Sequence, residues 1–199
     1  DYVWPDLRVY LQPVPHNDPD RPPPRRYEQA RIMGGGSTIN GQLAIRGAPA
    51  DYDAWHEMGA TGWNWDAVLP YFKKAERDLD FGEPLHGKAG PIPIRRIFPD
   101  DWSAFSAAAA EAYARAGYEY RPDMNGEFEI GHFPVPFSNA YDRRVSTAIG
   151  YLDPVTRGRD NLTIVAETQA TGLIFDGRRV TGIEAISGGQ RLTFQAHQV

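Results

Sequence analysis

Residues 31–42 read RIMGGGSTINGQ, and this stretch places three consecutive glycines directly before a serine, a threonine and an asparagine. Glycine has no side chain to pack and loses more conformational freedom on folding than other residues, so such a run marks a tight chain path or a close approach to a bulky group. Bare backbone amides at 34–37 can form an anion-binding concavity, to which Ser37, Thr38 and Asn40 add polar groups. Composition alone leaves two interpretations open, a tight connecting loop and a loop that contacts a ligand.

The familiar nucleotide-binding and hydrolase motifs do not fit this stretch. A P-loop needs a lysine after its last glycine, and the sequence has no lysine between Gly34 and Gly47. Both G-x-G-x-x-G and G-x-S-x-G would need a glycine at position 39, where the chain has Ile39. The glycine run is therefore not the loop that opens a dinucleotide-binding fold.

The composition narrows the class of protein further. The chain has 199 residues and no cysteine, and the lack of cysteine excludes disulfides, zinc ribbons and thiol nucleophiles. Its net charge of -5 disfavours nucleic acid as a partner. No apolar run approaches the roughly 20 residues that span a bilayer, and the first residues do not read as a signal peptide. We expect a soluble, cytoplasmic protein. Because the sequence starts at aspartate and stops within an expected strand, we also expect a piece of something larger.

Hydrophobic periodicity predicts helices in the middle of the chain. An irregular, proline-rich arm of about 30 residues comes first. Helices are then expected at 50–59, at 64–79 with Asn64 as N-cap and Pro70 as a kink or limit, and at 101–117 with Asp101 or Ser103 as N-cap. A short extended segment is expected at 92–97, and one more short helix within 143–152.

The last forty residues change to the alternating pattern of strands. Strands are expected at 161–167, 170–175, 179–186 and 191–196, with hairpin turns at Asp176-Gly177 and Gly188-Gly189. An arm, then helices, then an antiparallel meander is typical of the α+β class.

Residues 30–55, ARIMGGGSTINGQLAIRGAPADYDAW, closely resemble the signature of the glucose-methanol-choline flavoprotein oxidoreductases. The paired glycines, Asn40, Gly47 and Asp53 stand at the positions of that signature, and Met33 departs from it mildly. The similarity continues through HGKAGPIPI, NGEFEIGHFPV, RRVSTAIGYLDP and NLTIVAETQATGLIFDGRRVTGIEA in the same order. It therefore covers nearly the whole chain.

The resemblance implies a set of contacts to FAD. The backbone of Gly34, Gly35, Gly36 and Ser37 would lie beside the pyrophosphate, Asn40 and Gly41 would pass the reactive face of the flavin ring, and Leu43 and Ala170 would complete the contacts, Ala170 at the adenine end. Many members have serine where this chain has Gly36. Some attach FAD to a histidine one place before the asparagine, where this chain has Ile39, so we expect non-covalent FAD.

The resemblance also implies an incomplete enzyme that oxidises a small-molecule alcohol. Three segments are expected: 1–60 as the arm and flavin-contact loop, 61–158 as a helical region leading into the substrate domain, and 159–199 as strands of the FAD-binding domain. The ADP-binding and catalytic segments would be the partners of this fragment, and self-association of the fragment is the other expectation. The alternative is a non-catalytic or split-chain product that acts only by association.

None of the five histidines matches the family's catalytic position, so no catalytic residue is assigned. His16 and His197 lie near the ends and His56 on a helix, while His86 is expected to have a turn role. His132 could line a substrate cavity, although a structural role is favoured. Because no pair of histidines has the spacing of metal ligands, no metal is expected.

Overall fold

The computed structural model describes residues 2–13, 15 and 17–199, and His16 lies outside the described residues. The chain divides into two compact units, and the boundary in the sequence falls between Asp153 and Pro154. The combination of helices with antiparallel strands confirms the α+β class. The first unit contains β1 (Arg8–Val9), β2 (Arg25–Arg26), α1 (Gly36–Ile39), α2 (Pro49–Glu57), α3 (Trp65–Ala75), β3 (Glu76–Asp78), β4 (Ile92–Ile94), the 3-10 helix η1 (Pro99–Asp101), α4 (Ala104–Arg115), β5 (Asn139–Ala140), β6 (Arg143–Arg144) and α5 (Thr147–Gly150). The second contains α6 (Pro154–Arg157), β7 (Thr168–Asp176), β8 (Arg179–Ser187) and β9 (Gln190–Gln195).

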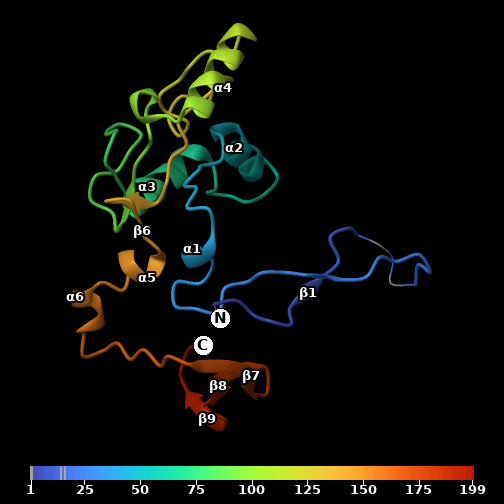
Figure 1. The fold of residues 1–199 in the computed structure, drawn as a ribbon. Coiled ribbons are helices and arrows are strands. Elements are labelled where there is room, and N and C mark those ends of the chain that lie inside the picture. Colours follow the sequence, from blue (N-terminus) through green and yellow to red (C-terminus); the bar gives the residue numbers. More distant parts are fainter. Residues whose placement is uncertain (1, 14, 16) are drawn as a thin grey trace. The chain divides into compact units, whose positions relative to one another are not determined.

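The N-terminal arm is a long two-stranded ribbon. β1 pairs antiparallel with β2, Arg8 opposite Arg26, and an isolated bridge joins Val3 to Ala30 (Figure 1). Three prolines precede β2, and proline is tolerated there because a two-stranded ribbon has only edge strands.

The helix expected at 64–79 is shorter than its sequence pattern indicates. Asn64 caps α3 as expected, since its side chain accepts a hydrogen bond from the Ala67 amide at 3.1 Å. The helix ends at Ala75, and Glu76–Asp78 instead form β3, which pairs in parallel with β4. The expectation was wrong for these residues because a tertiary contact overrides the local helical pattern.

The helices expected at 101–117 and 143–152 are also shorter. Ser103 caps α4, accepting from the Ser106 amide at 3.2 Å, while Asp101 belongs to η1. α5 begins only at Thr147, because Arg144 is held in the β5–β6 hairpin.

The second unit is a three-stranded antiparallel meander in the order β7-β8-β9. Gly177, Gly188 and Gly189 have positive φ angles at its two turns, as the turn pattern predicted. The prediction of a strand at 161–167 is wrong, since those residues have no strand partner in the described chain and form an irregular connection.

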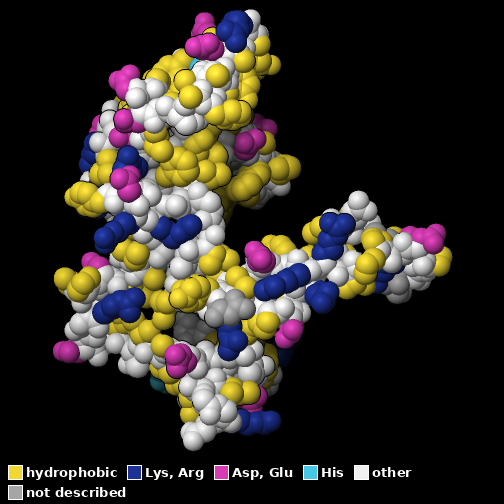
Figure 2. Space-filling view, in the orientation of Figure 1, with side chains coloured by type: hydrophobic (Ala, Val, Ile, Leu, Met, Phe, Trp, Pro, Cys, Tyr) yellow, Lys and Arg dark blue, Asp and Glu magenta, His cyan; other side chains and the backbone are white. Residues whose placement is uncertain are grey.

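The interior of the first unit is unusually polar. Among the described residues of this unit, the buried apolar residues are Ile94, Pro93, Pro134 and Pro136, whereas the buried polar or charged residues are Arg46, Glu76, Asp78, His86, Arg96, Asp123, Asn125 and Ser146. Hydrophobic side chains gather instead on the surface around α4 (Figure 2). No helix in the described part of the chain is long and apolar enough to cross a membrane.

Candidate functional site

The glycine run forms a tight turn that leads into α1. Gly34 and Gly35 have φ angles of 90° and 56°, and Gly35 is the N-cap of α1. A Cβ on Gly34 would lie 2.6 Å from Thr38 Oγ1, so this position is filled by the chain itself. A Cβ on Gly35 or Gly36 would meet no atom within 4 Å, so the turn is open on that side.

The hydroxyl groups of this loop stabilise the turn itself. Ser37 Oγ donates to the Gly34 carbonyl at 2.6 Å and Thr38 Oγ1 donates to the Met33 carbonyl at 2.9 Å. The first two amides of a helix have no partner within it, and those of Gly36 and Ser37 find none among the other described residues. The donors that remain at the turn are therefore backbone amides.

Residues 41–46 follow as an irregular segment with two different faces, in which Gln42 has a φ angle of 65°. Gly41, Leu43 and Ile45 are exposed, the last two at 55% and 53%. The alternate residues are turned into the unit, where the Gln42 carbonyl accepts from the Ser138 amide at 2.8 Å and the Ala44 amide donates to the Pro136 carbonyl at 2.9 Å. The segment thus presents an apolar face to solvent and is fixed from behind.

Asn125 anchors the inner face of this segment. Its Oδ1 accepts from the Arg46 amide at 3.0 Å, and its Nδ2 donates to the Ala44 carbonyl at 2.9 Å, as a neighbouring strand would do. The residue is only 1% exposed. The sequence did not reveal this role, because Asn125 precedes a glycine and reads as an ordinary turn residue.

The segment ends in a buried cluster of charges. Arg46 Nη2 pairs with Glu76 Oε1 at 2.6 Å, and Arg96 Nη1 pairs with Asp78 Oδ2 at 2.9 Å. His86 lies between these pairs. The three cations Arg46, His86 and Arg96 face the three buried carboxylates Glu76, Asp78 and Asp123, and a fourth carboxylate, the partly exposed Asp80, lies 3.4 Å from Arg96 Nη1 at the edge of the cluster.

Both ring nitrogens of His86 contact carboxylates. Nε2 lies 2.7 Å from Asp123 Oδ2 and Nδ1 lies 2.9 Å from Asp78 Oδ2, so the ring is held as an imidazolium. Burial by itself lowers the pKa of His86, but hydrogen bonds to Asp123, Asp78 and Glu76 outweigh it and raise the pKa to about 10. Burial acts to raise the pKa of each carboxyl group, but hydrogen bonds and neighbouring cations lower all three pKa values.

His86 is thus a central member of a charge cluster rather than a simple turn residue. Ligand atoms of Glu76, Asp78 and His86 lie within 4.8 Å of one another, a spacing that suits a metal ion. A metal ligand must be a neutral imidazole, however, and the cations Arg46 and Arg96 already neutralise these carboxylates. We assign the cluster a structural role, and the absence of a metal stays a prediction.

His132 lines a cleft of about 550 Å³ beside α4. Its ring stacks on Tyr113 with centroids 6.0 Å apart, and its Nδ1 lies 3.1 Å from the Tyr118 carbonyl oxygen. Phe105 on α4 borders the same cleft and is 83% exposed. The structure therefore gives His132 packing contacts in an aromatic cleft, and a role in binding substrate stays a prediction.

The predicted FAD contacts divide between the two units. Gly34, Gly35, Gly36, Ser37, Asn40, Gly41 and Leu43 come together in one loop of the first unit. Ala170 lies on β7 of the second unit, opposite Ala185, and its side chain is exposed. Its proximity to the loop stays a prediction.

Comparison with known proteins gives consistent similarities. The family described as GMC oxidoreductase matches residues 24–199. The chain is 43% identical over 199 residues to 5-(hydroxymethyl)furfural oxidase of Methylovorus sp. (strain MP688), covering 100% of this chain and 37% of the relative. It is 38% identical over 191 residues to oxygen-dependent choline dehydrogenase of Burkholderia ambifaria, covering 94% and 32%.

Solved structures show the same relationship. Pyridoxine 4-oxidase from Mesorbium loti superposes with a TM-score of 0.85 at 30% sequence identity, covering 98% of this chain and 37% of the neighbour. The chain therefore spans about a third of the length of the relatives that it matches.

Proposed function

Because the chain belongs to the GMC oxidoreductase family, we propose that it forms the central, flavin-contacting part of a longer FAD-dependent enzyme that oxidises a small-molecule alcohol. The observation that carries the proposal is the two-faced segment that follows the glycine turn. Its inner face is held by hydrogen bonds, and its outer face presents Gly41, Leu43 and Ile45 to solvent. A planar ring needs such a bare, apolar and rigid surface.

The turn itself suits the diphosphate of FAD. The open side of Gly35 and Gly36 gives clearance, and the amides of Gly36 and Ser37 provide donors for an anion. Asn40, Gly41 and Leu43 would then lie along the flavin ring. When bound, FAD accepts the hydride removed from the alcohol carbon. Ile39 has no nucleophilic atom, so we propose non-covalent binding.

The proposed substrate is a primary alcohol. The relatives are named for hydroxymethylfurfural, choline and pyridoxine, three small molecules that each carry a CH2OH group. Oxidation of such a group also needs a base to take the hydroxyl proton. The outer face of residues 41–46 carries no ionisable side chain, so we propose that the base comes from another part of the longer protein.

The test is purification of the longer protein that contains these residues. We expect a flavin absorbance band that stays with the protein through gel filtration and is released into the supernatant when the protein is precipitated with acid. Anaerobic addition of a primary alcohol should bleach the band. A colourless protein would contradict the proposed cofactor, and a flavin that remains in the acid precipitate would contradict non-covalent binding.

A further inference from the structure

The glycine loop is held from behind by Arg144 and Thr147, which lie more than 100 residues away in the sequence. Arg144 Nη1 donates to the Ser37 carbonyl at 3.1 Å and to Asn40 Oδ1 at 2.8 Å. The Thr147 amide donates to Ser37 Oγ at 2.9 Å, and Thr147 Oγ1 donates to the Gly34 carbonyl at 3.1 Å. All four contacts end on residues that we place beside FAD.

The contact with Arg144 also decides how the Asn40 amide is oriented. Oδ1 of Asn40 receives two donors, the Arg144 guanidinium and the Gln42 amide at 3.0 Å. Only the carbonyl oxygen of an asparagine can accept from such groups, so its NH2 group must face the other way. Asn40 is exposed, and its NH2 group has no partner in the part of the chain that the structure describes. Asn40 therefore presents a fixed pair of donors to whatever covers the loop.

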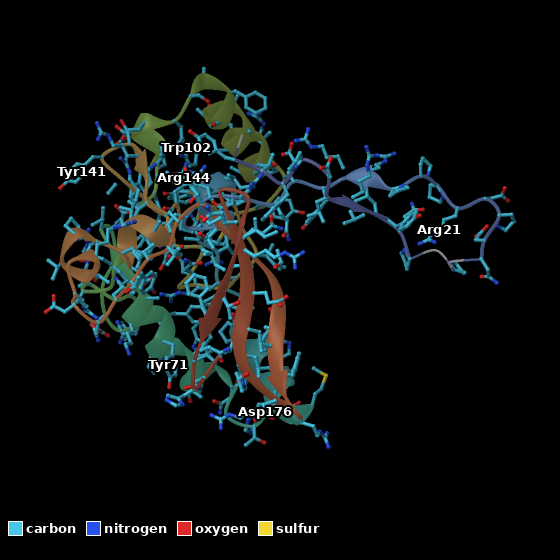
Figure 3. All side chains as sticks on the ribbon, turned by 90° about the horizontal axis from the view of Figure 1, so that it is seen from below. Arg21, Tyr71, Trp102, Tyr141, Arg144 and Asp176 are labelled. Carbon is cyan, nitrogen blue, oxygen red and sulfur yellow. The ribbon has the colours of Figure 1, made fainter. Side chains whose placement is uncertain are left out.

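A short hairpin brings Arg144 to this position. β5 pairs antiparallel with β6, Asn139 opposite Arg144, through a turn in which Tyr141 and Asp142 have φ angles of 53° and 57°. Successive residues of a strand point to opposite faces, so Arg143 is exposed while Arg144 turns inward. Figure 3 labels Arg144 and the turn residue Tyr141, which is 93% exposed.

We propose that Arg144 is a positioning residue of the flavin site, which acts by holding Asn40 with its amide donors outward and by fixing the turn at Ser37. This inference rests on the proposed function. A flavin ring carries carbonyl oxygens and ring nitrogens as hydrogen-bond acceptors, and donors that are oriented before binding need no further ordering when the ring arrives. Arg144 does not itself need to touch the cofactor.

The experiment compares Arg144→Met with the matched control Arg143→Met in the longer protein. FAD is removed, and its rebinding to the apoprotein is followed by flavin fluorescence and by the visible flavin spectrum. We expect Arg144→Met to weaken FAD binding about tenfold or more, as loss of a hydrogen bond from a charged group does, and to change the shape of the flavin spectrum. Arg143→Met should match the wild type in both measurements. The FAD affinity of Arg144→Lys should lie between that of the wild type and that of Arg144→Met.

A double-mutant cycle tests whether Arg144 acts through Asn40. If it does, Arg144→Met should weaken FAD binding much less in an Asn40→Ala background than in the wild type. Additive effects, or equal FAD binding by the Arg144→Met and Arg143→Met variants, would overturn the inference while the proposed function stands. A wild-type protein that binds no FAD would overturn both. If Arg144→Met does not fold, the same cycle with Arg144→Lys tests whether Arg144 acts through Asn40.

Discussion

Gly34, Gly35 and Gly36 are neighbours, but the structure gives them different physical requirements. Gly34 combines a positive φ angle with a crowded position against Thr38 and Ala148, so both its conformation and its space demand glycine. Gly35 has the positive φ angle but open surroundings. Gly36 has neither constraint, so nothing in the described chain explains why it lacks a side chain.

These differences predict opposite results for two substitutions. Gly34→Ala should lower the free energy of unfolding of the longer protein by about 1 to 3 kcal/mol, because it forces a side chain into a strained and occupied position. Gly36→Ser should change it by less than about 0.5 kcal/mol, since its Cβ meets no protein atom within 4 Å. Urea titration measures both effects. A Gly36→Ser variant as unstable as Gly34→Ala would contradict this account of the turn.

At the level of elements, the charge cluster ties the segment of residues 41–46 to β3 and to the loops around it. Arg46 closes the segment, Glu76 and Asp78 are the ends of β3, and His86 follows in the next loop. Removing one partner of such a buried cluster leaves an uncompensated charge and costs about 3 to 5 kcal/mol. The cluster thus fixes the chain direction at the end of the segment.

Because folding raises the pKa of His86, we predict that the stability of the protein depends on pH. Because folding raises the pKa of His86 from 6.5 to about 10, the stabilisation is complete below pH 6.5 and is lost as the pH rises towards about 10. The lowered pKa values of Glu76, Asp78 and Asp123 have the opposite effect, so their stabilisation is lost in acid, once the pH falls below their ordinary values of 4.5 and 3.8.

His86→Gln tests this account. The variant should be less stable than the wild type at pH 6, and the difference should shrink as the pH rises towards 10, because the wild type then loses the stabilisation that the variant lacks. Unfolding by urea at a series of pH values measures this difference in the free energy of unfolding. The exposed His197 serves as the control, and His197→Gln should follow the wild-type curve. A constant difference between His86→Gln and wild type would contradict the imidazolium assignment.

At the scale of the whole molecule, each unit leaves large apolar side chains exposed. They include Phe105 and Tyr113 on α4 of the first unit, and Leu173 and Phe175 on β7 of the second. Such surfaces are typical of faces that another part of a protein covers.

We therefore predict that the 199 residues alone neither retain FAD nor oxidise alcohols, and that they self-associate. Gel filtration of this chain after incubation with FAD should give a colourless, early-eluting peak, because the contacts to ADP and the cover of the apolar faces are missing. Adding the flanking segments as separate chains should restore a flavin band if a split protein can assemble. A flavin band that co-elutes with the monomeric chain would contradict the prediction.

The family and the class of fold could be predicted from the sequence, because short-range patterns encode them, whereas the flavin contacts of the glycine loop stay a prediction. Asn64 and Ser103 cap their helices through side chains three residues from the amides that they bind, and the glycine turns of the meander need only local backbone preferences. Predictions failed where a distant segment intervened. Residues 76–78 leave the helical pattern to pair with β4, and Arg144 is held in a hairpin rather than in a helix.

The sequence by itself determined that residues 31–42 form a bare, polar-flanked turn, since glycine content and spacing are properties of the chain alone. Only the tertiary structure decided what fixes that turn and the segment after it: Arg144 lies behind Asn40, Asn125 holds the inner face of residues 41–46, and the cluster around His86 stands at their end. Asn125 lies 79 residues from Arg46 in the sequence, and Arg144 lies 104 residues from Asn40. Their hydrogen bonds depend on burial and direction, which arise only when distant segments are packed together.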